Sequence, residues 1–167
     1  LPLTYSTITL ARSITKKNLI AMSSTQTTGT RKFLSATLSD AEDLFVEMIR
    51  QIQEEREEDS DFFNSEVGDT GIGFSLLASS EAVTANITGE KAVQDDNGLE
   101  EEERERLSRR GWTLPEEEGG DEMAVGRSWK GVTSRADRRH IAAEMLSVAT
   151  EIYGLSEDLE IRFYRRP

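Results

Sequence analysis

Cysteine is absent from this 167-residue chain. Its absence excludes disulfide scaffolds, thiolate zinc sites, iron–sulfur clusters and cysteine nucleophiles. Histidine occurs once, which excludes metal sites built from several imidazoles. Long apolar runs are missing as well, since no stretch approaches the roughly 18 residues that a membrane-spanning helix needs. We therefore expect no membrane insertion.

Charge is plentiful and mostly negative. The chain holds 32 acidic and 20 basic side chains, which gives a formal net charge of −12 and a pI near 4.6. A surface this acidic repels phosphate, so nucleic acid is not expected as a partner. The length is typical of one small domain.

The charge divides the chain into three segments. Residues 1–39 carry five bases and no acid, residues 40–122 carry 26 acids and seven bases, and residues 123–167 are slightly basic. The first segment is rich in serine and threonine and has no repeating apolar face, which is typical of disorder. We predict a disordered basic tail over 1–37 and one folded domain over 38–167. An alternative start within the tail, or a targeting peptide, stays open for the first segment.

Three helices are predicted from capping sequences and apolar spacing. A capping box at Ser39 precedes apolar residues at three- and four-residue spacing, which predicts a helix over about 39–58. Leading acids and trailing bases predict a shorter helix over 99–110. A further cap at Ser134 and a broad apolar stripe predict a well-buried helix over 135–153.

A two-residue period indicates strands between the first two helices. Residues 71–78 and 82–88 alternate, and three residues separate them, so we expect an antiparallel hairpin. An earlier strand is expected at 62–67 and a last one at 159–164. This order predicts the α+β class: an antiparallel sheet of about four to five strands with an N-terminal helix and a long C-terminal helix packed on it.

A family resemblance rests on short segments in a fixed order. These are Glu81-Ala82-Val83, Leu107, Arg110-Gly111-Trp112-Thr113-Leu114-Pro115, and Ile152-Tyr153-Gly154-Leu155 followed by Leu159. Together they resemble the actinobacterial TY-Chap proteins, relatives of the YbjN-like proteins and of the type III secretion chaperone fold. The resemblance implies a small, often dimeric α+β domain that binds proteins, with no known catalytic residues to carry over. The basic tail and the long acidic runs depart from the family's pattern.

We therefore expect a non-enzymatic protein-binding module, chaperone- or adaptor-like, which acts in the cytoplasm as a homodimer. Acidic surface combined with half-buried strands favours a protein client that is basic or partly unfolded. The alternative is an inhibitor or immunity-type protein that captures a folded basic partner. Binding of an unfolded segment would indicate the first function, whereas binding of a folded site would indicate the second.

Catalytic and metal-binding patterns are not found in the sequence. His140 has Asp137 and Glu144 at i−3 and i+4, so local ion pairs explain it without a catalytic role. The acidic runs lack the ligand spacing of a calcium loop. We predict no catalytic residue, no metal ligand and no cofactor.

Four apolar residues are candidates for partner binding: Leu77, Trp112, Leu114 and Trp129. Tryptophan is enriched at binding hot spots, but core packing against its own helix is the alternative for Trp112. Burial against the last helix is the alternative for Trp129. Leu77 lies on the opposite side of its strand from Phe74, which predicts an apolar group on the second face of the sheet. Its alternative position is under the first helix.

Overall fold

Among the residues that the structure describes, one antiparallel sheet of seven strands forms the centre of the fold, in the order β1-β2-β7-β3-β4-β5-β6. The computed structural model describes residues 26–28, 31–55, 61–88, 99–114 and 125–165. The elements are, in chain order, β1 Gln26–Thr28, β2 Arg31–Thr37, a 3-10 turn Leu38–Asp40, α3 Glu42–Glu54, β3 Asp61–Val67, β4 Ile72–Ala78, β5 Ala82–Thr88, α5 Glu101–Arg109, β6 Val125–Lys130, α6 Arg135–Ser147, a π-helical turn Val148–Ile152 and β7 Glu160–Arg165.

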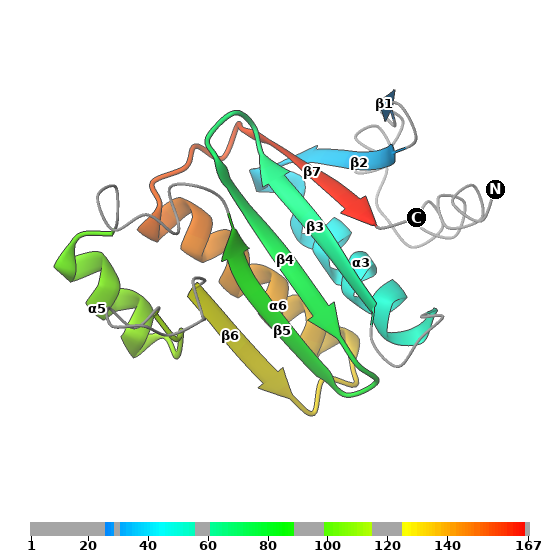
Figure 1. Cartoon of the computed structure of the whole chain (residues 1–167). Coiled ribbons are helices and arrows are strands. Elements are labelled where there is room, and N and C mark those ends of the chain that lie inside the picture. The colour runs from blue at the N-terminus through cyan, green and yellow to red at the C-terminus, as the bar shows by residue number, and fades with distance from the viewer. Residues whose placement is uncertain (1–25, 29–30, 56–60, 89–98, 115–124, 166–167) are drawn as a thin grey trace, which may run out of the picture.

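Both long helices cover the same face of the sheet. In Figure 1, α3 and α6 lie behind the strands, and the face toward the viewer has no labelled helix over it. The strands alternate accordingly: on β5, Val83, Ala85 and Ile87 are buried and the residues between them are half-buried. We call the side away from α3 and α6 the uncovered face.

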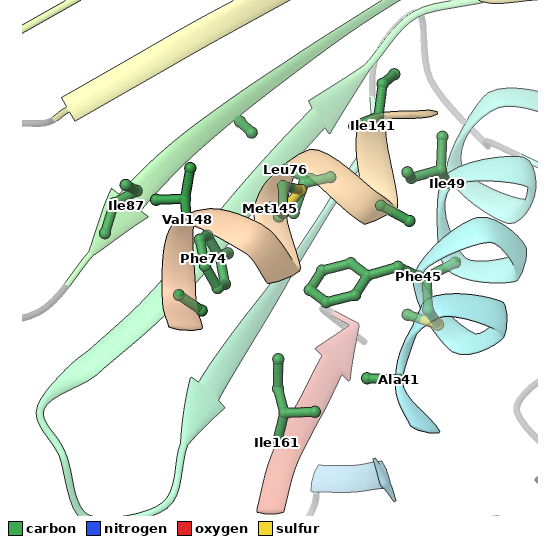
Figure 2. Packing of buried hydrophobic residues seen from close by; sticks show 14 of the residues in the cluster. Ala41, Phe45, Ile49, Phe74, Leu76, Ile87, Ile141, Met145, Val148 and Ile161 are labelled. Atoms are coloured by element: carbon green, nitrogen blue, oxygen red, sulfur yellow. The ribbon is translucent and has the colours of Figure 1, made fainter. Parts of the chain in front are cut away.

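Phe45 of α3 lies at the centre of the core and has no exposed surface. Its ring centroid is 4.8 Å from that of Phe163, 6.0 Å from that of Phe74 and 6.4 Å from that of Phe63. The rings meet tilted or edge-on, the arrangements that aromatic quadrupoles favour. Figure 2 shows the Phe45 side chain pointing from α3 into the space beside α6 and β7. The core therefore joins α3 to three strands of the sheet.

The structure confirms the α+β class and the main elements. The predicted hairpin is β4 and β5, the earlier strand is β3, the last strand is β7, and the shorter helix is α5. The long C-terminal helix is α6 with its π-helical turn. The predicted cap of α6 is also present: the Asp137 amide donates to Ser134 Oγ at 3.1 Å, and the Ser134 amide donates to Asp137 Oδ2 at 2.9 Å.

The sheet is larger than the four to five strands predicted, because β1, β2 and β6 were missed. β2 pairs with β7 from Phe33 opposite Tyr164 to Thr37 opposite Glu160. The tail predicted over 1–37 is therefore wrong for the residues of β1 and β2, and the rest of that tail lies outside the described residues. The partner of β2 is β7, which lies far along the chain. The local pattern of β2 therefore does not reveal that it is a strand.

The capping box predicted at Ser39 is wrong. Ser39 lies in the 3-10 turn, where its hydroxyl is 3.0 Å from that of Thr37, and α3 starts after Ala41 without a side-chain cap. The predicted end of this helix falls in residues 56–60, which lie outside the described residues.

Candidate functional site

The four predicted contact residues fall into two groups. Leu77 of β4 lies on the uncovered face, whereas Trp112, Leu114 and Trp129 gather where the end of α5 meets β6. Leu114 and Trp129 are half-buried against the core. The structure therefore does not bring Leu77 together with the other three.

Leu77 is 45% exposed, and it is the one exposed large hydrophobic side chain among the described residues. It lies opposite Phe62 of β3 and Thr84 of β5. Its neighbour Leu76 points to the helices and is fully buried, as Figure 2 shows. The alternative that placed Leu77 under the first helix is therefore wrong.

Uncharged polar side chains lie beside Leu77 and its apolar neighbour Phe62 on the uncovered face. The hydroxyls of Thr84 and Ser128 lie 2.8 Å apart across β5 and β6. The next row across the sheet holds Asn64, Ser75 and Asn86 in register. This part of the face offers two apolar side chains, Leu77 and the half-buried Phe62, beside hydrogen-bonding groups without charge.

The end of α5 positions Trp112. Gly111 has φ +85°, the left-handed region that glycine adopts without strain. Its amide donates to the Ser108 carbonyl at 3.0 Å, and the Trp112 amide donates to the Leu107 carbonyl at 3.1 Å. This Schellman closure folds Trp112 back over the last turn of α5. Because Trp112 is 3% exposed, we assign it to packing rather than to partner contact.

Glu144 of α6 holds this region together. Its Oε1 accepts hydrogen bonds from Arg110 Nε and Trp112 Nε1, both at 3.0 Å, and its Oε2 accepts from Arg110 Nη2 at 3.0 Å. Arg127 Nη1 of β6 lies 3.2 Å from Oε1. One carboxylate thus joins α6 to the end of α5 and to β6. We call Glu144, Arg110, Trp112 and Arg127 the Glu144 cluster.

Trp129 completes the contact between α5 and β6. Its ring meets that of Trp112 edge-on at 6.0 Å, and Arg127 Cζ lies 4.9 Å from its centroid. Its buried indole N–H has no hydrogen-bond partner in the described part of the chain. Trp129 is therefore packed against Trp112 and Arg127 rather than presented as an open aromatic platform.

Glu144 also makes the stability of the fold depend on pH. Burial opposes ionisation of its carboxyl group, but the hydrogen bonds from Arg110 and Trp112, with the charges of Arg110 and Arg127, outweigh burial and lower its pKa below the ordinary 4.5. A lowered folded-state pKa adds stability that is fully present above the unfolded-state pKa and is lost as the pH falls through the folded-state pKa.

We expect Glu144→Gln to lower the free energy of unfolding by about 1–2 kcal/mol at pH 7, because charge-assisted hydrogen bonds are lost. The difference from the wild type should shrink as the pH falls below 4.5. Urea unfolding at pH 7 and pH 3 measures both quantities. Glu151→Gln is the control, since that exposed carboxylate makes one 3.1 Å bond to Arg110. A Glu144→Gln loss that is equal at both pH values would contradict the assignment.

A second polar cluster was not found from the sequence. Gln53 of α3 is 5% exposed, and its Nε2 donates to the carbonyls of Val132 at 3.0 Å and Ser79 at 3.3 Å. Its Oε1 accepts from Arg138 Nε of α6 at 2.9 Å, and Arg138 reaches Glu54 at 3.1 Å. These bonds join both helices to the β4–β5 turn. The position of a polar residue, Gln53, on the buried side of α3 was the available signal. This signal does not show which residues Gln53 binds.

His140 lies on the solvent side of α6. It is exposed, and its expected ion pairs are not formed, because Asp137 caps α6 and Glu144 binds Arg110. Within the described ranges, no group of three or more histidine and acidic side chains could hold a metal ion. No described helix is long and apolar enough to cross a membrane.

Comparison of the chain with protein-family models, with curated proteins and with solved structures finds no match in any of the three. The resemblance to the TY-Chap and YbjN-like proteins therefore stays a prediction.

Proposed function

We propose that the chain is a non-enzymatic protein-binding module, chaperone- or adaptor-like, whose contact surface is the uncovered face of the sheet. The exposure of Leu77 carries this proposal. The other large hydrophobic side chains of the described residues are buried or half-buried, yet Leu77 leaves nearly half of its surface to solvent. Leu77 also lies opposite the half-buried Phe62 on this face, and adjacent apolar side chains rimmed by polar groups mark interaction sites.

The chemistry around Leu77 suits an extended protein segment. Such a segment brings apolar side chains for Leu77 and main-chain amides for the hydroxyl and amide groups of Thr84, Ser75 and Asn86. The charged side chains Glu66 and Arg162 lie opposite each other toward the β7 side of the same face. The net charge of −12 would speed encounter with a basic client and would be screened by salt.

The homodimer and the cytoplasmic location belong to the same proposal. A second copy that covered Leu77 would contact a patch without charged side chains. Repulsion between the two chains, each with a net charge of −12, would therefore be smallest at this patch. Light scattering over a range of concentrations tests the dimer.

We expect Leu77→Asn to weaken client binding about tenfold, the effect of losing one buried leucine side chain from an interface. The probe is a small basic protein, egg-white lysozyme, which is kept unfolded by reduction. Binding is measured by fluorescence anisotropy, and aggregation by light scattering. Ala143→Asn, on the exposed side of α6, is the matched control and should bind as the wild type does.

Two outcomes would contradict this proposal. Unchanged affinity of Leu77→Asn would exclude the uncovered face as the contact surface. Equal affinity for native and reduced lysozyme would favour an inhibitor of folded proteins over a chaperone. Weakening of binding between low and high salt is expected in either case.

A further inference from the structure

β6 is a terminal strand of the sheet, and one of its residues already accepts another chain segment. The Thr113 amide donates to the Gly126 carbonyl at 2.7 Å, and the Gly126 amide donates to the Thr113 carbonyl at 3.0 Å. The main-chain groups of Gly126 therefore point away from β5. In an antiparallel ladder, residues two apart share this orientation.

Ser128 and Lys130 consequently also point their amide and carbonyl groups outward. Their β5 opposites are Thr84 and Ala82. The carbonyl of Ala82 bonds to Ser79 in the β4–β5 turn instead of to β6, as this register requires. No described segment pairs with Ser128 or Lys130 on the outer side, because Trp112 turns from the edge into the core directly before Thr113. Two donors and two acceptors thus face outward from β6.

The side chains at this edge favour one kind of partner. Lys130 is exposed and forms no ion pair with the described residues, whereas Arg127 is held by Glu144. Because no described carboxylate neutralises Lys130, the edge favours a partner strand that places an acidic side chain beside Lys130. A second copy of this chain, paired through the same edge, would bring two Lys130 ammonium groups together, the usual protection against edge-to-edge pairing.

We propose that the β6 edge from Ser128 to Lys130 binds an extended strand of a partner protein, antiparallel to β6, with one carboxylate side chain facing Lys130. This surface goes beyond the uncovered face, because the partner's backbone is recognised instead of an apolar side chain. The bonds between Thr113 and Gly126 provide the pattern that the partner strand continues.

Amide hydrogen exchange tests the backbone part of the proposal. The probe is a capped seven-residue peptide of alternating valine and threonine with one glutamate at its centre. In the free protein, the Ser128 and Lys130 amides should exchange quickly, while the Arg127 and Trp129 amides, which face β5, should be protected. The peptide should slow exchange at Ser128 and Lys130. Unchanged exchange of these two amides at millimolar peptide would overturn the proposal.

Ser128→Pro removes the outward donor without removing a bond to β5, and proline is tolerated at such edge positions. It should retain the wild-type near-ultraviolet circular dichroism and lose at least tenfold in peptide affinity. Ser128→Ala is the matched control, since it also loses the hydroxyl contact with Thr84 but keeps the backbone amide. Equal affinity of Ser128→Pro and Ser128→Ala, with both folded, would overturn the proposal.

Lys130→Glu tests the charge. It should reverse the preference for the glutamate peptide over the same peptide with a central lysine, with a change of about threefold to fivefold for each peptide. Ala143→Asn, on the exposed side of α6, should leave peptide affinity unchanged. If Leu77→Asn removes peptide binding and Ser128→Pro does not, the peptide binds the uncovered face; the function proposed above then stands and the edge site is wrong.

Discussion

Replacing Trp112 by alanine is expected to lower the free energy of unfolding by about 3–5 kcal/mol, the usual cost of truncating a buried tryptophan. The side chain is 3% exposed and packs edge-on against Trp129. Its indole N–H also binds Glu144 at 3.0 Å. Urea unfolding followed by circular dichroism measures the loss. Unchanged stability together with lost client binding would show that Trp112 is a contact residue instead.

A pair of conservative substitutions isolates the indole hydrogen bond. Trp112→Phe keeps a ring but removes the donor to Glu144, whereas Trp129→Phe removes an N–H that has no partner among the described residues. We expect Trp112→Phe to cost more than Trp129→Phe by about 1–2 kcal/mol, since the bond to a carboxylate is charge-assisted. Equal costs would mean that the bond to Glu144 adds little.

Phe45→Ala is expected to cost about 3–5 kcal/mol as well, because it opens a cavity in the core. The Phe45 ring contacts Phe63, Phe74 and Phe163, so α3 would lose its main contact with three strands. The midpoint of urea unfolding should fall. Leu77→Ala is the control: it removes an apolar side chain that is 45% exposed and should change stability by less than about 0.5 kcal/mol. Similar losses for the two variants would contradict the assignment of the core.

The sequence predicted those elements whose residues carry their own signal. The two-residue alternation at 82–88 buries Val83, Ala85 and Ile87 on β5 as expected. The serine before the long helix caps α6 through Asp137. The alternation repeats with the two-residue period of a strand, and the cap joins residues three apart in the chain, so a local pattern is sufficient in both cases.

β6 shows why other elements were missed. Its alternation places Arg127 and Trp129 beside Val125 on the core side. A charged residue at an inward position obscures the apolar period, and it is tolerated there because Glu144 binds Arg127 and Trp129 stacks with it. β2 was missed for a related reason, since its place in the sheet depends on pairing with β7, far along the chain.

The candidate site was predicted in part. The sequence placed Leu77 on the opposite side of its strand from Phe74, and the structure confirms this placement. The environment of Trp112 could not be predicted, because Glu144 and Arg127 come from distant parts of the chain. The hydrogen bond between Gln53 and Arg138 could not be predicted for the same reason. The two side chains bind each other at 2.9 Å, but 85 residues separate them in the chain.

The sequence by itself determined the α+β class, the alternation that exposes Leu77, the cap of α6 and the net charge of −12, because each depends on neighbouring residues or on composition. Only the tertiary structure decided that the described residues form a sheet of seven strands, that α3 and α6 cover one face, and that Ser128 and Lys130 lie at an edge with which no other described segment pairs. Strand pairing and the contacts of buried polar groups join residues of large separation. Their free energy depends on where the whole chain places each partner, so no local pattern can specify them.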